Sequence, residues 1–371
     1  MNLRWIYFAI MVVNLLIQFN ASGITTPSIS ANTLFLYRNS NLHKGNINAT
    51  DLDQTPNGLN IQEAELQFYS DVDPYTRLSL LLSIAPQYTS DGITVSEEWG
   101  VEPEEVFAES NILSDITFKI GKFKAAIGKH NGLHTHAFPF IDPPIANTQL
   151  LGDEGLNDVG VSTAILFSTD WFNELTIQYL RGKGENDEFK SPSPSMGVGL
   201  AHWKNLFDLN DDLTIEIGAS YAQGGNSFSK MTLLSGADIT FKWRPSEGGR
   251  YTSLLWSTEY LSRKQTQVAV AEEKGFGFAS WVQYQFSERW SCSYRYDQLK
   301  VSESFDPIKL LNTTWVKNSL GFIYTPSEFS SYRIEYDHKH SGVKNNDNES
   351  TEKTFYLQAN FTIGAHPVHV Y

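Results

Sequence analysis

Residues 331–339 read Ser-Tyr-Arg-Ile-Glu-Tyr-Asp-His-Lys, and this stretch decides the fold class. Successive side chains of a β-strand point to opposite faces, so Tyr332, Ile334 and Tyr336 share one face and charged residues occupy the other. A strand of this kind fits a soluble sandwich with a wet outer face as well as a membrane barrel. The choice between the two depends on how this strand is connected to its neighbours.

Connections along the chain alternate between short turns and long polar segments. Short turns are predicted at Asp71–Pro74, Asn111–Asp115, Ser168–Trp171, Phe207–Asp212, Pro245–Arg250, Ser287–Arg289 and Pro326–Phe329. Long loops are predicted at Ser40–Asn57, Gln87–Glu102, Lys129–Asn157, Gly182–Ser195, Gly224–Lys230, Lys264–Lys274, Val301–Thr313 and Gly342–Lys353. Short turns on one rim and long loops on the other are typical of bacterial outer-membrane barrels. The pattern predicts an all-β fold, a single antiparallel transmembrane β-barrel of about 16 strands.

Aromatic residues gather beside the short turns, where an interfacial girdle of a membrane barrel lies. They are Trp171, Phe172, Trp243, Tyr251, Phe286, Trp290, Tyr324 and Phe329. The last predicted strand, residues 355–363, is apolar at its odd-numbered positions. An even number of strands places both termini on the short-turn side, which we expect to be periplasmic.

The first 23 residues predict a cleaved signal peptide. Arg4 precedes an apolar run from Trp5 to Phe19, and small residues follow up to Gly23. The alternative is a transmembrane anchor, but this run is shorter than the roughly 20 residues that a helical span needs. We therefore expect export, followed by a mature barrel of residues 24–371.

Composition restricts the class of protein and its partners. The 371 residues carry a formal net charge of −14 and one cysteine, so an internal disulfide framework is excluded. Nucleic-acid binding depends on clustered lysine and arginine, so no nucleic-acid partner is expected. The expected partners are outer-membrane lipids and small solutes or ions. The sequence leaves open whether the barrels associate as a homotrimer.

The segment 129–157 is the longest predicted loop. Three prolines stiffen it, and its apolar residues Phe138, Phe140 and Ile141 are suited to packing against a barrel wall. Long loops inside a regular β pattern are usually functional. We expect this loop to fold into the lumen and narrow the pore. The predicted constriction residues are His130, His134, His136, Asp142, Asp153 and Glu154.

Charged side chains that oppose an apolar face on their own strand should line the lumen. The predicted lining residues are Arg77, Lys119, Arg295, Asp297, Arg333, Glu335 and Asp337, together with Glu63, Glu65, Glu216, Asp238, Lys242 and Glu259.

Histidines of the long loop are candidate metal ligands. On an extended segment His134 and His136 point to one side, and His130 or a nearby carboxylate could complete a site for zinc or another divalent metal. The alternative is that these histidines only cap or solvate the turn. A second candidate pair, His366 and His369, lies near the C-terminus. A channel of this class requires no cofactor.

The sequence motifs do not indicate a catalytic function. The chain has no Gly-x-Ser-x-Gly, no phosphate-binding glycine loop and no His-Glu-x-x-His. Cys292 shares an apolar face with Trp290 and Tyr294, which is a packing position. We therefore expect that the protein is not an enzyme. A gated, energy-coupled receptor is disfavoured as well, because few residues lie between Gly23 and the first strand.

A set of short motifs extends over most of the mature chain. They are VDPY at 72–75, VEPEE at 101–105, GKFKAAIGKHN at 121–131, HTHA at 134–137, LGDEGLNDVGVS at 151–162 and GAHPVH at 364–369. With these motifs the chain resembles a poorly characterised family of porin-like bacterial outer-membrane proteins. Some members are labelled zinc-regulated or receptor-like, and the family is distantly similar to phosphate-selective porins.

The resemblance implies an outer-membrane channel for passive passage of small solutes or ions, with a possible relation to metals. A phosphate-selective channel would line its constriction with lysine and arginine, whereas Lys129 is the only basic residue of this loop besides histidine. Phosphate selectivity is therefore not favoured, although Lys119, Lys122 and Lys124 precede the loop. The alternative is a binding or adhesion barrel that acts through its external loops.

Overall fold

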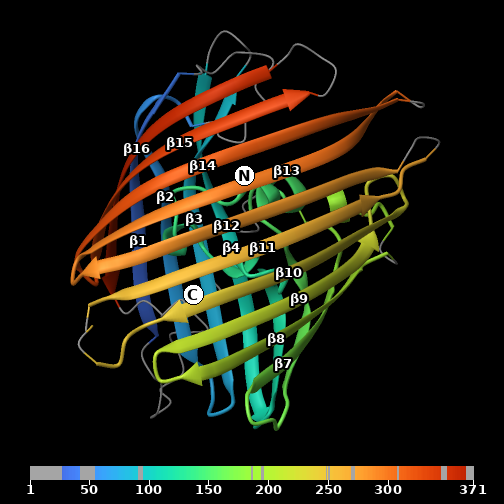
Figure 1. Ribbon diagram of the computed structural model, residues 1–371. Coiled ribbons are helices and arrows are strands. Elements are labelled where there is room, and N and C mark those ends of the chain that lie inside the picture. The colour runs from blue at the N-terminus through green and yellow to red at the C-terminus, as the bar shows by residue number, and fades with distance from the viewer. Residues whose placement is uncertain are drawn as a thin grey trace, which may run out of the picture.

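The computed structural model describes residues 27–41, 55–90, 95–184, 187–193, 196–247, 249, 251–268, 272–306, 309–343 and 349–364. The predicted signal peptide and the pair His366 and His369 lie outside the described residues. The described strands form one closed antiparallel barrel in which sequence neighbours pair and β1 pairs with β16 (Figure 1). Within the described ranges, no helix has the length and apolar character needed to cross a membrane.

Strand lengths differ around the barrel. The strands are β1 (Ser28–Ser40), β2 (Gly58–Asp71), β3 (Thr76–Ser90), β4 (Val95–Leu113), β5 (Ile116–Lys124), β6 (Asn157–Leu166), β7 (Phe172–Leu180), β8 (Val198–Asn210), β9 (Leu213–Gly225), β10 (Met231–Trp243), β11 (Ser253–Gln265), β12 (Glu273–Ser287), β13 (Trp290–Asp306), β14 (Lys309–Ser327), β15 (Ser330–Val343) and β16 (Glu349–Gly364). Closure pairs the edge strands, as a lipid environment requires. The predicted fold class and strand number are confirmed.

The two faces of the wall follow the sequence alternation. On β15, Ile334 is 49% exposed on the outer surface, whereas its neighbour Glu335 is 2% exposed inside the barrel. On β16, Leu357 is exposed and Tyr356 is buried. Apolar groups therefore face outward, where lipid replaces water, and polar groups face the lumen.

Four predicted long loops are wrong in extent, because the strands continue through most of them. At the predicted loop Gln87–Glu102, β3 and β4 remain paired through Gln87 and Glu98. The predicted loops at 264–274, 301–313 and 342–353 are shortened in the same way. Strands that rise beyond the lipid have water near both faces, so their sequence loses the apolar alternation that marks a membrane strand.

The connection between β5 and β6 differs from the others, because it turns inward and carries helical segments. These are η1 (His130–Gly132), η2 (Thr135–Ala137) and α2 (Ile145–Leu151). The sequence predicts a loop throughout 129–157, so α2 is a correction. Gly152, with φ +93°, follows the helix and ends it. Figure 1 shows this green segment inside the ring of strands.

A substitution on β15 tests the assignment of faces. Ile334→Arg should destabilise the membrane-inserted barrel by about 2–4 kcal/mol if the residue lies near the bilayer midplane, because arginine would face lipid. Unfolding in urea from vesicles measures this cost. The control Glu328→Arg changes a short turn and should cost much less. Equal costs for both variants would mean that the outer face is misassigned.

Candidate functional site

The base of the inward loop is closed by Asn131. The backbone N–H of Ala125 donates to the carbonyl of Leu156 at 2.8 Å, which joins the two ends of the loop. The Asn131 amide donates to the Ala125 carbonyl at 2.8 Å and accepts from the Leu156 N–H at 2.7 Å. A side chain at Gly155 would place its Cβ 2.3 Å from the Asn131 oxygen, so glycine is required there.

Glu259 on β11 fixes the first turn of the loop. Its carboxylate accepts the backbone N–H groups of Lys129 at 2.7 Å and His130 at 2.9 Å, and the Asn147 amide of α2 at 3.0 Å. The Lys129 ammonium lies 2.6 Å from Glu216 on β9. These contacts attach both η1 and α2 to the wall formed by β9 and β11.

Helix α2 packs closely against β12. A Cβ at Gly277 would lie 2.1 Å from the Cβ of Ala146, and a Cβ at Gly275 would lie 2.6 Å from Leu150. Leu150 and Leu151 join a buried apolar cluster with inward residues of several strands, including Leu261. The lumen beside α2 is therefore filled by side chains.

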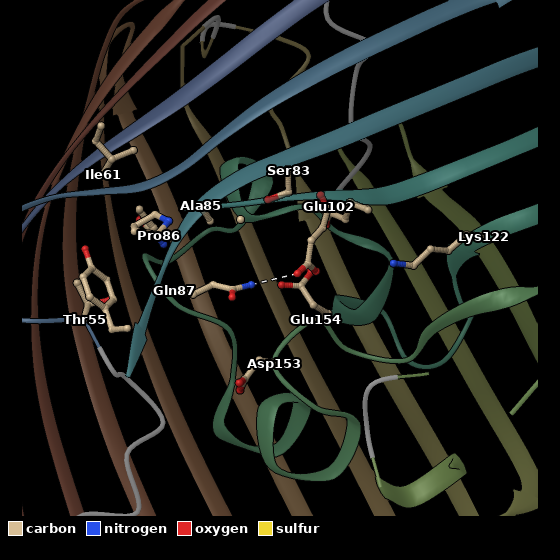
Figure 2. A pocket seen from close by; sticks show the side chains of 14 residues that line it. Thr55, Ile61, Ser83, Ala85, Pro86, Gln87, Glu102, Lys122, Asp153 and Glu154 are labelled. Carbon is tan, nitrogen blue, oxygen red and sulfur yellow. Dashed lines mark hydrogen bonds between the residues drawn. The ribbon is translucent and has the colours of Figure 1, made fainter. Parts of the chain in front are cut away.

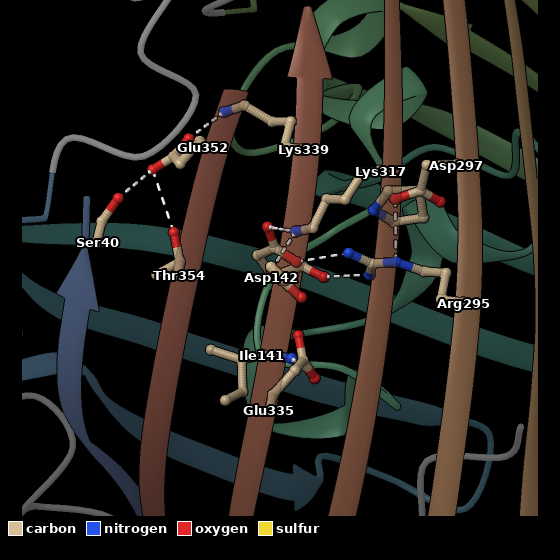
Figure 3. A network of polar contacts seen from close by, with 12 residues as sticks. Ser40, Ile141, Asp142, Arg295, Asp297, Lys317, Glu335, Lys339, Glu352 and Thr354 are labelled. Atoms are coloured by element: carbon tan, nitrogen blue, oxygen red, sulfur yellow. Dashed lines mark hydrogen bonds and ion pairs between the residues drawn. The ribbon is translucent and has the colours of Figure 1, made fainter. Parts of the chain in front are cut away.

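The tip of the loop is fixed to the wall opposite its origin. Asp142 lies between Arg295 on β13, at 2.6 Å, and Lys317 on β14 (Figure 3). Arg295 also lies 3.0 Å from Asp297, and Lys317 lies 2.6 Å from Asp337. Strand β13 is eight positions from β5 in the ring of 16, so the loop crosses the full width of the lumen.

The charge state of Asp142 follows from these neighbours. Enclosure would raise the pKa of Asp142, but the cations Lys317 and Arg295 hold it well below its usual range. Arg295 and Lys317 are 1% and 4% exposed, whereas the Asp142 side chain is 35% exposed. An ionised Asp142 therefore supplies negative charge to two buried cations.

Backbone groups near the tip are held as well. Arg333 donates to the carbonyl of Phe138 at 2.7 Å, and the N–H of Ile141 donates to Glu335 at 3.2 Å. The Arg295 guanidinium lies 4.6 Å from the centroid of the Phe140 ring, which is a cation–π contact. The tip is thus attached to β13 through a ring contact and an ion pair, and to β15 through backbone hydrogen bonds.

His134 is bound by two carboxylates of β4. Its Nδ1 lies 3.0 Å from Glu104 and its Nε2 lies 3.0 Å from Glu105. Consecutive residues both face the lumen because the β3–β4 register shifts here, so that Glu104 forms a bulge. Burial would lower the pKa of His134, but the two carboxylates raise it to about 10. His134 is therefore an imidazolium at neutral pH, with both nitrogens occupied.

His136 lies beside His134 with its ring parallel at a centroid distance of 6.0 Å. Its Nδ1 lies 2.6 Å from Glu65 on β2. Glu63, Glu65 and Glu104 bring one carboxylate oxygen each within 4.8 Å of one another. A second group of carboxylates among the described residues, Asp142, Glu335 and Asp337, meets the same condition.

His130 lies apart from these contacts and packs against Phe138, with ring centroids 4.5 Å apart. Burial lowers the pKa of His130 to about 3, assisted by the charges of Arg295 and Lys124, so the ring is neutral. No group of three converging ligand atoms among the described residues contains His130, His134 or His136. These three predicted constriction residues are buried, since each is at most 8% exposed.

A cavity of about 380 Å³ lies between the loop and strands β2 to β4 (Figure 2). Asp153 and Glu154 of the loop line one side, and Glu102 and Glu104 line the other. Thus the structure separates the predicted constriction residues. Asp153 and Glu154 border open space, Asp142, His134 and His136 pair with charged residues of the wall, and the His130 ring packs within the loop.

The predicted lining residues lie on inner faces, but at different depths. Arg295, Asp297, Glu335 and Asp337 are buried under the loop tip, and Arg333 binds the loop backbone. Lys119 pairs with Glu109 at 3.6 Å, and Arg77 pairs with Asp71 near the short turns. Their contribution to conduction stays a prediction.

Sequence reasoning missed Lys317, Glu104 and Glu105. Trp315 lies two residues before Lys317 and faces the lumen as well, so the inner face of this strand does not look polar in the sequence. Two adjacent glutamates cannot share a face of a regular strand, but Pro103 directly before them is a signal of a bulge. That signal could have placed both carboxylates in the lumen.

Comparisons with known proteins agree with a porin-like barrel. The anion-selective porin from Comamonas acidovorans matches with a TM-score of 0.55 and 8% identity, covering 92% of this chain and 99% of that chain. OprB from Pseudomonas putida matches with a TM-score of 0.58 and 8% identity, covering 91% and 94%. The trimer form of OmpT from Vibrio cholerae matches with a TM-score of 0.55 and 12% identity, covering 91% and 99%.

These structural likenesses show the fold class, a closed antiparallel β-barrel that resembles outer-membrane porins. In sequence, the chain is 27% identical to an uncharacterized protein of Aquifex aeolicus (strain VF5) over 353 residues, which cover 84% of this chain and 70% of the relative. No family model matches the chain.

The His134 ion pairs predict a pH dependence of loop docking. Because the folded-state pKa lies near 10 and the ordinary value is 6.5, this contribution is complete below about 6.5 and is lost as pH rises through 10. Protease cleavage within the loop should therefore increase between pH 7 and pH 10.5. In His134→Gln the loop should be cleaved more readily at pH 7, and the further increase in cleavage up to pH 10.5 should be smaller than in the unmodified protein. An identical pH response in both proteins would contradict this role of His134.

Proposed function

We propose that the protein is an outer-membrane channel for passive passage of small solutes or ions. The observation that carries this proposal is the loop 125–156, which crosses the lumen and borders a cavity of about 380 Å³ beside strands β2 to β4. A fixed loop inside a wide barrel sets the narrowest section and hence the size of solute that passes.

Placement in the outer membrane is part of the same proposal. The short turns and both barrel ends, Ser28 and Gly364, lie on one rim, which we assign to the periplasm. A homotrimer is proposed by analogy with the trimer form of OmpT. Gel mobility of unboiled samples tests this assembly.

A binding or adhesion barrel is the second candidate. Strands such as β4 and β14, each of 19 residues, are longer than the roughly 9–11 residues that a membrane strand needs, so they present wall outside the lipid. Single-channel recording separates the two candidates. An adhesion barrel closed by its loop gives no current, whereas a porin conducts.

Removing the loop tests the constriction. Deletion of His130–Pro144 should increase single-channel conductance, because it removes the contacts that hold the loop across the lumen. A point variant, Asp142→Ser, should increase conductance or its fluctuations with less disturbance of the fold. Heat-modified gel mobility verifies that each barrel is folded. Unchanged conductance in the folded deletion variant would show that the loop is not the constriction.

A relation to divalent metal is a secondary part of the proposal. The carboxylate group Glu63, Glu65 and Glu104 favours it, because oxygen donors converge there, and His136 contacts Glu65. Micromolar zinc should reduce current through the unmodified protein and act more weakly on Glu63→Gln. Loss of the zinc effect in a His134→Ala, His136→Ala variant but not in Glu63→Gln would favour the histidine site instead. Equal zinc effects on all forms would exclude both sites.

A further inference from the structure

We infer that ions cross the barrel along the wall formed by β2 to β4 and that the acidic cavity on this path makes the channel cation-selective. The inference rests on the proposed channel function and adds the class of solute. It also assigns a role to Glu102, which lies on β4 outside the loop.

The path follows from a comparison of the two sides of the loop. Opposite the origin of the loop, Arg295 and Lys317 are almost completely buried by the tip, and α2 fills the lumen beside β12. The cavity beside Asp142 and Lys317 on that side has a volume of about 40 Å³. Along β2 to β4 the cavity of about 380 Å³ remains. Toward the short turns, exposure rises again, from 25% and 28% for the side chains of Glu109 and Lys119 to 45% for Arg77.

The charge of the cavity favours cations. Its lining includes the carboxylates of Glu102, Glu104, Asp153 and Glu154 and one ammonium, that of Lys122. Lys122 donates to the carbonyl of Pro103 at 2.8 Å. Figure 2 shows the Glu102 and Glu154 carboxylates pointing toward one another. Two like charges that face a common space are stabilised by a mobile counter-ion between them.

A buried oxygen at the inner end of the cavity supports the same conclusion. Glu104 is 4% exposed, and its Oε1 lies 2.8 Å from Lys124 and 3.0 Å from His134. Its Oε2 is buried and has no hydrogen-bond partner among the described residues. A buried carboxylate oxygen without a partner is costly. A cation that passes the inner end of the cavity would relieve this cost transiently.

Glu102 is suited to tuning selectivity without supporting the fold. It is exposed on β4, and its described polar contact is the Gln87 amide at 3.0 Å. Asp153 is exposed on the loop beside α2. Both carboxylates can be neutralised without removing the ion pairs that fasten the loop at Asp142 and His134.

Reversal potentials in a KCl gradient test the inference. The unmodified channel should prefer potassium over chloride, and the double variant Glu102→Gln, Asp153→Asn should lose more than half of its reversal potential. The double variant Glu102→Lys, Asp153→Lys should shift the preference toward chloride. A matched control, Glu272→Gln with Glu328→Gln, removes the same charge away from the cavity and should change the potential little.

A cysteine variant locates the path independently. In a Cys292→Ser background, Ala85→Cys places a thiol in the cavity wall, and a cationic methanethiosulfonate reagent should reduce its current. The background protein should not respond.

Each outcome separates the inference from the proposed function. Absence of current in the unmodified protein would overturn the channel function itself. Conduction without cation preference, or with the same preference in the cavity and control variants, would overturn the inference alone. Current that is insensitive to modification at position 85 would exclude this path.

Discussion

The ion pairs of Asp142 with Arg295 and Lys317 determine what the lumen looks like. They join a loop that begins between β5 and β6 to strands on the opposite side of the barrel. Arg295 and Lys317 are buried and also pair with Asp297 and Asp337, so the Asp142 carboxylate adds to a charge network on the wall that the tip reaches in this position of the loop. The loop therefore has one strongly preferred position, and the open space beside it is a consequence of that position.

Further contacts hold the loop at several points along its length. Asn131 closes its base, Glu259 holds its first turn, and Glu104 and Glu105 hold His134. Glycines of β12 admit α2 close to the wall. Because these contacts lie on strands all around the ring, the loop also connects distant parts of the wall inside the barrel.

Much of the fold could be predicted from the sequence, because each membrane strand must face lipid on one side and water on the other. The apolar residues Tyr332, Ile334 and Tyr336, which alternate with charged residues, are a direct example of this requirement. The same rule failed where strands leave the lipid, and the loops predicted at 87–102 and 301–313 proved to be mostly strand. Without lipid on one side, the polar pattern of such a strand does not differ from that of a loop.

The site was predicted less completely. The inward position of the loop follows from its apolar residues, since Phe140 and Ile141 are buried against the wall. The role of His134 could not follow, because its partners Glu104 and Glu105 depend on a bulge about 30 residues away in the sequence. Histidine spacing suggests a metal site only while the carboxylates that occupy the ring nitrogens are unknown.

Exclusion of neutral polymers tests the central claim most directly, because it measures the narrowest section of the conducting path. Polyethylene glycols of increasing size enter a channel and lower its conductance until they are too large to pass the entrance to the constriction. If the fixed loop forms that constriction, Asp142→Ser should admit larger polymers than the unmodified protein. An unchanged size limit in a folded and conducting Asp142→Ser barrel would contradict the account.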